Sequence, residues 1–500
     1  MPTKIIYYQD LFLLHFGISE FLEKNFECEQ YALIDTTNKP KKFFQSQKLV
    51  NFKKKWFFHD NINIDSSSPD VDYLKKFEEK YGINLWQLAI NERHFYRFNK
   101  FYKFSDNEIL SIMEQECKLF EKILDETKPD FFIMFQPSLR PEYIFYQLCK
   151  KKNVIPLIIN PSIIGYKTYI STEITDIDSD ENLSTIKSTN RNFEQLRDYR
   201  KKFDLNRQII DYIEDFGDDR SSTFDAGNEY LFKSDNSNIK THYTYFGRTK
   251  SKVLFDAISS RIIKKKSRSS FLEKNALKQI GNEKFVYFPL QVDPDRNLLL
   301  GAPYFTNQIE SIRNITKSLP VDYKLYVKEH PGQRREWRDI SFYKEILDIP
   351  NVKLIHPSFS SEKIYEKCSL VVTIGGSSGF EAAFFGKPVI IFTNTIYGRL
   401  DCVTQINNYT ELPSAIITGI NKQIEPDNLD KFLIFLDKNS FDFDLFGYFF
   451  IEKKEFFYDS VLIDVEIKES KMKNFLGKHA SLFSIIGNQL IKEIKQRQSI

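Results

Sequence analysis

Short apolar runs rich in β-branched and aromatic residues alternate with longer amphipathic stretches along the first third of the chain. In the stretch from Asp106 to Glu126 the apolar residues recur with a period of about 3.6, which is typical of a helix packed on a core. The runs predicted as strands are 4–9, 31–35, 130–135 and 154–159. Strands that alternate with helices in this way predict an α/β domain.

The alternation becomes more regular from Lys284 onward. The apolar runs there carry few polar residues, as expected of strands covered on both faces by helices. The predicted strands are 285–290, 324–328, 351–355, 370–374 and 388–392, and helices are predicted over 308–319 and 361–368. This order predicts a second, doubly wound parallel sheet.

Polar and charged segments separate these regular parts. A loop is predicted over 173–190, a charged helical region from about 192 to 215, a polar patch over 218–238 and a Lys/Ser-rich stretch over 264–274, where the domain boundary is placed. A Phe/Asp-rich region (441–457) and one amphipathic helix (471–496) end the chain. We therefore predict an N-terminal domain with a helical insertion (1–275), a C-terminal domain (276–425) and a helical, aromatic extension packed on both (426–500).

Composition narrows the class of protein. A chain of 500 residues suits two domains, and its formal charge of +3 does not call for nucleic acid as a partner. Five scattered cysteines without a CxxC pair indicate a reduced, cytoplasmic protein. The N-terminus does not resemble a signal peptide, and no apolar stretch is long enough to span a bilayer. Any membrane contact is expected to be peripheral, for example through the basic stretch from Ile262 to Ser270.

The loop after the predicted strand 370–374 contains Gly375, Gly376 and Gly379 around two serines. Ser378 and Glu381 fit a capping box at the start of a helix. Glycines let backbone amides approach an anion closely, and the helix N-terminus adds partial positive charge, so the loop favours a phosphate. The alternative is a tight turn that binds nothing. It accounts for the capping pair but leaves Ser377 and the three glycines unexplained.

Two further loops follow strands of the same sheet. In the first, His330 precedes Pro331, with Lys328 and Arg334 nearby, and these groups could neutralise a phosphate leaving group. The alternative is a turn histidine, which is our interpretation of the other His-Pro pair at His356. The second loop starts at Gln291 and contains a DxD string (Asp293 and Asp295) of the kind that holds a metal in some sugar transferases. Because helix dipole and basic side chains already offset phosphate charge here, we expect no metal.

Other common chemistries have no matching motif. The glycine spacing fits neither the dinucleotide fingerprint nor the P-loop, and the chain contains no GxSxG or HExxH string. Dehydrogenase, P-loop ATPase and common hydrolase chemistry are therefore not predicted.

The segment from Phe285 to Phe392, with its YVKEHPGQ and TIGGSSGFEAAFFGKPVIIF strings, resembles the capsule polysaccharide biosynthesis proteins, relatives of bacterial Kdo and sialic acid transferases. Residues 81–98 are similar to the N-terminal half of that family more loosely. The resemblance implies a GT-B arrangement, in which two Rossmann-like domains face a cleft, and it implies catalysis without a metal or other cofactor. It also implies that an HP motif and a serine pair contact the donor phosphate, and these match His330-Pro331 and Ser377-Ser378.

Together, the residues and the resemblance predict a donor site at the strand ends of the C-terminal domain. Its members are Lys328, His330, Gly375, Gly376, Ser377, Ser378, Glu381 and Gln291. The N-terminal domain would take the acceptor, and it lacks the acidic motif of the family. Strand-end loops there offer Asp10, Glu92 and Glu142 as candidate bases, and Arg93 and Arg140 as candidate ligands for an anionic acceptor.

The predicted function is a cytoplasmic glycosyltransferase that takes a CMP-sugar or similar donor and extends a surface polysaccharide, with a glycan or glycolipid as acceptor. It would contact the membrane or the polysaccharide export machinery at most peripherally. The alternatives are a nucleotide-sugar epimerase with two Rossmann-like domains, a CDP-polyol phosphotransferase, and a non-catalytic nucleotide-sugar-binding partner in an assembly complex.

Overall fold

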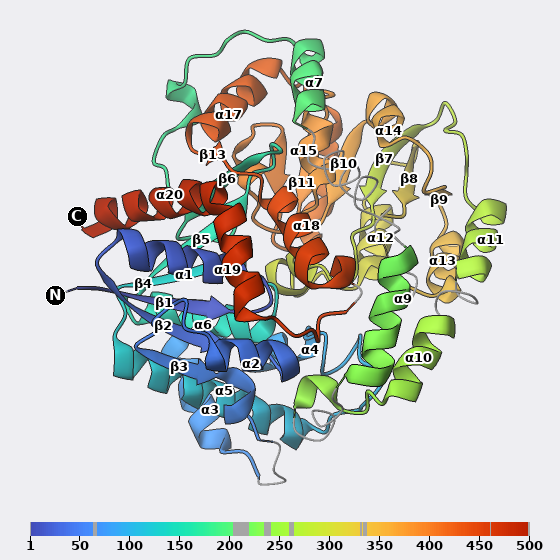
Figure 1. The fold of residues 1–500 in the computed structure, drawn as a ribbon. Helices are drawn as coiled ribbons and strands as arrows, with labels where there is room; N and C mark the ends of the chain where they lie inside the picture. The colour runs from blue at the N-terminus through green and yellow to red at the C-terminus, as the bar shows by residue number, and fades with distance from the viewer. Residues whose placement is uncertain are drawn as a thin grey trace.

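The computed structural model describes residues 2–63, 68–203, 220–234, 242–259, 265–330, 333, 338–460 and 462–498. Within these residues the chain forms two sheets, one in each half, with helices packed on both faces of each (Figure 1). The predicted α/β fold with two Rossmann-like halves is confirmed.

The N-terminal sheet has the strand order β13-β6-β5-β4-β1-β2-β3. Its central strands are parallel, whereas β6 and β13 run antiparallel to their neighbours. The strands are β1 (Thr3–Gln9), β2 (Cys28–Ile34), β3 (Lys54–Phe57), β4 (Phe131–Phe135), β5 (Ile155–Pro161), β6 (Lys167–Ser171) and β13 (Phe441–Asp442). The sequence did not predict β3, β6 and β13, which are edge or near-edge strands interrupted by lysine or acidic residues.

Alternate residues of β1 point to opposite faces of this sheet. Ile5 and Tyr7 join one core, and Ile6 and Tyr8 join the other. The first core is covered by α1 (Leu14–Asn25), α2 (Asn38–Ser46), α18 (Leu445–Phe456), α19 (Glu469–Lys478) and α20 (Ala480–Gln498). The second is covered by α3 (Val71–Tyr81), α4 (Leu85–Ile90), α5 (Asp106–Thr127) and α6 (Arg140–Lys151).

The C-terminal sheet is parallel throughout and has the order β12-β11-β10-β7-β8-β9. Its strands are β7 (Lys284–Pro289), β8 (Tyr323–Lys328), β9 (Val352–Ile355), β10 (Leu370–Thr373), β11 (Val389–Ile391) and β12 (Val403–Gln405). The chain order changes direction between β7 and β10. In open α/β sheets a ligand crevice lies at such a switch point, outside the carboxyl ends of the strands.

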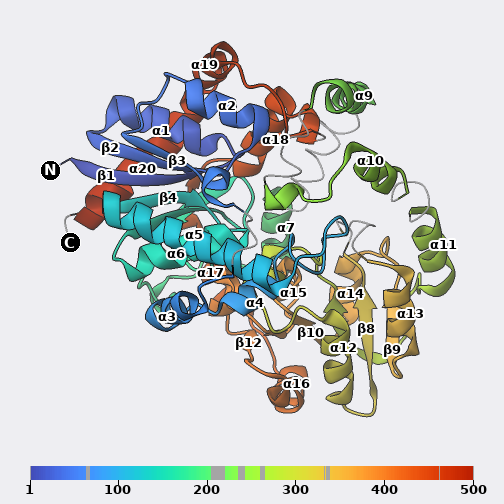
Figure 2. The same ribbon diagram turned by 90° about the horizontal axis from the view of Figure 1, so that it is seen from below.

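Helices from several parts of the chain cover this second sheet. One face packs against α7 (Phe193–Lys202), α14 (Ser361–Lys367), α15 (Ser377–Ala383) and α17 (Pro426–Lys438). The other packs against α11 (Lys265–Asn275), α12 (Gln308–Lys317), α13 (Ile340–Asp348) and α16 (Leu412–Ile420). Two further helices, α9 (Arg220–Asn228) and α10 (Lys250–Ser259), lie at the periphery (Figure 2).

The C-terminal segment returns from the second half to the first. After α17 the chain enters the N-terminal sheet as β13, and α18–α20 then pack beside α1 and α2 (Figures 1 and 2). The prediction of one helix over 471–496 is wrong, since the helix is broken at His479 into α19 and α20. No helix among the described residues combines the length and apolarity that a membrane span requires.

Candidate functional site: two facing strand edges

The two halves meet where the strands of both sheets end. Past α4, the side-chain amide of Asn91 donates to the carbonyl oxygens of Leu299 (3.1 Å) and Pro303 (3.3 Å). The guanidinium of Arg97 donates to the carbonyl oxygen of Thr306 at 3.1 Å. These contacts join the loop after α4 to the loop after β7, so the carboxyl edges of the two sheets share one interface.

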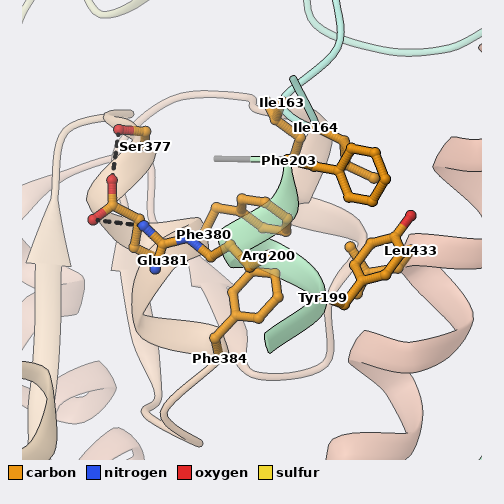
Figure 3. Close-up of a pocket in the computed structure, with 10 residues that line it drawn as sticks. All are labelled: Ile163, Ile164, Tyr199, Arg200, Phe203, Ser377, Phe380, Glu381, Phe384 and Leu433. Carbon is orange, nitrogen blue, oxygen red and sulfur yellow. Dashed lines mark hydrogen bonds and ion pairs between the residues drawn. The ribbon is translucent and has the colours of Figure 1, made fainter. Parts of the chain in front are cut away.

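A pocket beside α15 takes side chains from both halves of the chain (Figure 3). Ile163 and Ile164 come from beyond β5, and Ser377 and Glu381 come from α15. Its wall is mostly apolar, with the charged groups and Ser377 at one end and the hydroxyl of Tyr199 at the other. The other lining residues are Tyr199, Arg200, Phe203, Phe380, Phe384 and Leu433.

The sequence predicted that backbone amides of the glycine loop after β10 would approach an anion, but two of them are hydrogen-bonded within the protein. The side chain of Gln291, with its oxygen directed at the loop, accepts from the backbone N–H groups of Gly375 at 2.8 Å and Gly376 at 2.7 Å. These two amides are therefore already paired inside the protein. Because a Cβ on Gly375 would lie 2.4 Å from Thr393 Cγ2, close packing also explains why this position is a glycine.

The predicted capping box is wrong. Helix α15 starts two residues earlier than the capping box implies, with Gly376 rather than Ser378 at the N-cap and no side-chain cap. Glu381 instead receives a hydrogen bond from the hydroxyl of Ser377 (3.2 Å) and one from the hydroxyl of Tyr365 (3.1 Å). Arg200 of α7 forms an ion pair with the same carboxylate at 3.4 Å (Figure 3). Glu381 thus connects α15 to α14 and α7.

Lys328 and His330, at the end of β8, lie within electrostatic range of Glu381. The ammonium group of Lys328 donates to Ser361 at 2.8 Å. Desolvation lowers the pKa of Lys328, opposed by the charge of Glu381. Desolvation also lowers the pKa of His330, opposed by Glu329, among other acids. Ser377 therefore contacts the Glu381 carboxylate directly, and Lys328 and His330 lie within its electrostatic range, while Pro331 and Arg334 lie outside the described residues.

A buried ion cluster supports the loops at this edge. Arg338 forms ion pairs with Glu329 (2.6 Å) and Asp293 (2.8 Å), and all three side chains are buried. The hydroxyl of Tyr343 donates to Glu329, and the amide of Gln308 donates to Asp293 at 3.0 Å. The first aspartate of the DxD string therefore serves to hold the loops after β7 and β8 together.

The strand ends of the N-terminal sheet bring two of the three base candidates together. Asp10 follows β1 and Glu142 lies in the first turn of α6, and both line one small cavity with His15. Burial raises the pKa of Glu142 to about 8, and the charge of Asp10 adds to the effect. Backbone N–H groups of Ser138 (2.6 Å) and Leu139 (3.1 Å) hold the Glu142 carboxyl in place.

The third base candidate, Glu92, and the proposed acceptor ligand Arg140 are buried in another cluster. Arg140 is 1% exposed, pairs with both oxygens of Glu116 and lies 3.4 Å from Glu92. Burial raises the pKa of Glu92, but His94 and the arginines outweigh it and leave that pKa at about 2. These contacts argue against a base role for Glu92 and an acceptor role for Arg140. Arg93 is half-buried, and its Nε has no hydrogen-bond partner among the described residues.

Sequence reasoning missed several titratable groups at this edge. His15 lies 3.7 Å from Asp10 and lines the same cavity. Asp35 accepts from Tyr8 (2.8 Å) and pairs with His59 (2.9 Å). Asp35 could have been found, because it ends a predicted strand. His59 follows β3, which was not predicted, and Glu452 comes from α18, far away in the sequence.

Comparisons with known proteins agree with the C-terminal half of this picture. Residues 225–410 match the sequence model of the family described as capsule polysaccharide biosynthesis protein. The predicted resemblance is thereby confirmed for that part of the chain. Protein FixF of Sinorhizobium fredii is 30% identical over 135 residues, which is 26% of this chain and 32% of that relative. The match thus spans about a third of the relative's length.

Solved structures with a broad match are distant. The beta Kdo 2,7 transferase KpsC of Thermosulfurimonas dismutans is 15% identical, with 73% of this chain and 92% of that chain covered and a TM-score of 0.32. The UDP-GlcNAc 2-epimerase of Methanocaldococcus jannaschii is 14% identical, with 88% and 99% covered and a TM-score of 0.25. Neither likeness bears on the chemistry of this chain.

Proposed function

We propose that this protein is a glycosyltransferase that moves a sugar from a CMP-activated donor to a capsule-type polysaccharide or its lipid-linked precursor. One observation carries the proposal: the segment that matches the capsule polysaccharide family contains Ser377, which donates to Glu381, and His330, which lies within electrostatic range of the same carboxylate. The reaction would take place in the cytoplasm or at the inner face of the membrane.

The C-terminal edge has the chemistry that a departing nucleotide requires. Negative charge develops on the donor phosphate as the glycosidic bond breaks, and positioned donors stabilise it. Lys328 supplies a cation, His330 an imidazole N–H, and Ser377 and Ser378 supply hydroxyls. Glu381 would repel a phosphate, so in this proposal it orders Ser377 and accepts from sugar hydroxyls. Gln291 acts indirectly by fixing Gly375 and Gly376.

The N-terminal edge would supply the acceptor side. Removing the proton of an acceptor hydroxyl requires a positioned base, and Asp10 and Glu142 line a cavity at the strand ends of this sheet. Arg93, in the loop that contacts the C-terminal half, would hold an anionic part of the acceptor. No metal is assigned to either edge.

Donor binding tests the proposal first. We expect CMP and CMP-sugars to raise the melting temperature, since a ligand that binds only the native state stabilises it by mass action. His330→Ala and Ser377→Ala should each weaken CMP binding about tenfold, the effect of one lost hydrogen bond to a charged group. His356→Ala, at the other His-Pro pair, is the matched control and should bind CMP normally.

Turnover then separates the reaction classes. A transferase consumes CMP-sugar only when a glycan acceptor is added. Donor isomerisation without acceptor would instead support an epimerase, and transfer from a CDP-polyol would support a phosphotransferase. Binding without turnover in the presence of capsule oligosaccharides would leave the protein as a non-catalytic partner. Unchanged CMP affinity in both His330→Ala and Ser377→Ala would remove the donor site.

A further inference from the structure

His15, in the first turns of α1, is held in one protonation pattern by its surroundings. Its side chain is 3% exposed, and its Nε2 accepts the backbone N–H of Phe135 at 2.8 Å. An imidazole nitrogen that accepts a hydrogen bond carries no proton, so the proton of the neutral ring is on Nδ1. Nδ1 has no hydrogen-bond partner among the described residues and lies 3.7 Å from Oδ1 of Asp10.

Asp10 is the accessible carboxyl group of this cavity. Its side chain is 35% exposed, whereas Glu142 is 6% exposed. Oδ1 of Asp10 accepts the backbone N–H of Phe12 at 2.8 Å, which anchors one oxygen at the end of β1. The 3.7 Å separation from His15 exceeds a hydrogen bond, and such contacts are often long in a free enzyme and shorten when substrate is bound.

Two buried glutamates from other elements also face Asp10. Oε2 of Glu142, on α6, accepts three hydrogen bonds from Ser138 and Leu139, so this oxygen is turned toward its own loop. Glu452 of α18 is 1% exposed, and burial raises its pKa well above the usual value, with Asp10 adding to the effect. Burial thus favours the protonated form of both glutamates, and Asp10 is the accessible carboxyl group among the three.

Asp35 is the next acid along the same edge. Burial raises its pKa, but hydrogen bonds from His59 and Tyr8 outweigh this, so Asp35 stays ionised. Its oxygens are occupied by Tyr8 and His59. Asp35 therefore discourages ionisation of Glu142 without being available to a substrate itself.

We propose that Asp10 accepts the proton of the acceptor hydroxyl and that His15 is its positioning residue, donating Nδ1–H to the carboxylate. This assignment rests on the proposed function. As the acceptor oxygen forms its bond to the anomeric carbon, the bond from that carbon to the phosphate oxygen breaks and its electron pair leaves with CMP. The acceptor O–H proton moves to Asp10. His15 keeps its proton throughout, because Nε2 is occupied by Phe135.

Two substitutions of His15 separate positioning from packing. His15→Asn places an amide N–H near the Nδ1 position and can still donate to Asp10, but it loses the acceptor for Phe135. His15→Gln can still accept from Phe135, but it loses the donor to Asp10. We expect His15→Gln to lower kcat about tenfold and to move the acidic limb of the kcat profile to higher pH, with KM for the donor unchanged. His15→Asn should recover most of the rate.

Asp10→Asn should lower kcat about 100-fold or more, the range of a lost general base. Full activity of Asp10→Asn would overturn the proposal. So would the reverse order of the His15 variants, with His15→Gln active and His15→Asn impaired, because that order indicates a purely structural role.

A spectroscopic measurement separates this proposal from the failure of the proposed function. In protein labelled with ¹⁵N-histidine, the signals of His15 should show a protonated Nδ1 and an unprotonated Nε2, and Asp10→Asn should shift the Nδ1 signal. If the wild type transfers no sugar but these signals are found, the proposed function fails and the pairing stands. If His15 carries its proton on Nε2, or does not respond to Asp10→Asn, the positioning role is wrong even in an active transferase.

Discussion

The carboxyl edges of the two sheets occupy equivalent places in two similar folds, yet they hold charge differently. The C-terminal edge presents neutral amides and hydroxyls near the carboxylate of Glu381, with Lys328 and His330 alongside. The N-terminal edge is crowded with buried carboxyl groups and imidazoles, among them Glu142 and His15. Hydrogen-bond donors at the first edge would suit a phosphate, and carboxyl groups at the second would suit a group that takes up a proton.

The comparison also separates groups with a chemical role from groups that only support the fold. Each edge contains a buried arginine between two acids: Arg338 between Glu329 and Asp293, and Arg140 near Glu116 and Glu92. Both arginines are nearly inaccessible. They hold loops in place, and the residues that could touch a substrate lie beside them.

Breaking the buried cluster of the N-terminal half should have the largest effect. Arg140→Met leaves the carboxylate of Glu116 without its cation and removes one of the cations beside Glu92, and removal of one partner of a buried pair costs about 3–5 kcal/mol. Urea denaturation would measure this loss in the free energy of unfolding. Lys54→Met, which breaks an exposed pair with Glu126, is the control and should leave the urea midpoint nearly unchanged. A small effect of Arg140→Met would mean that the cluster is hydrated.

An intermediate effect is expected at the C-terminal edge. Gln291→Leu removes the oxygen that accepts from Gly375 and Gly376, and a buried N–H left unpaired costs about 1–3 kcal/mol. The same substitution should weaken CMP binding, because the loop loses its support. Gln291→Glu keeps an acceptor and should be the milder variant in both measurements. If Gln291→Leu binds CMP more tightly, the free amides of the loop contact the phosphate directly.

The last effect is spread over several pH units, so it is small over any short step of pH. The folded-state pKa of Glu142 is raised to about 8 from an ordinary value near 4.5, so between these values the unfolded state binds fewer protons than the folded state. The stability contributed by this group is complete below about pH 4.5 and is lost as pH rises toward 8, by at most about 1.4 kcal/mol per pH unit. Glu142→Gln should flatten this decline. Urea titrations at pH 5, 6.5 and 8 would measure it, and equal slopes in both proteins would contradict the raised pKa.

Much of the fold could be predicted because its signals are local. Apolar runs between polar turns marked β1, β4, β7, β8 and β10 nearly to the residue. Since ligands of parallel sheets collect at strand ends, the same runs pointed to Asp10, Glu142 and His330. Short edge strands were missed, because they lack a sustained apolar pattern.

The roles of individual residues at the site depended on contacts that sequence spacing does not contain. Gly379 faces Tyr397, where a Cβ would lie 2.8 Å from the hydroxyl oxygen, so this glycine serves packing as well as any ligand. Arg140 looked available for an acceptor because no local pattern reveals that Glu116, on α5, faces it. Glu452 approaches Asp10 only because the end of the chain folds back on its beginning.

That return has a consequence for biosynthesis. Gly17 of α1 packs so closely on Phe483 of α20 that a Cβ would lie 2.0 Å from the ring. The apolar side of α1 therefore stays uncovered until α20, far later in the chain, has been made, whereas the C-terminal sheet is covered mainly by helices close to it in sequence. During synthesis, the apolar surface of α1 is therefore exposed to chaperones for as long as the ribosome needs to make the segment between α1 and α20.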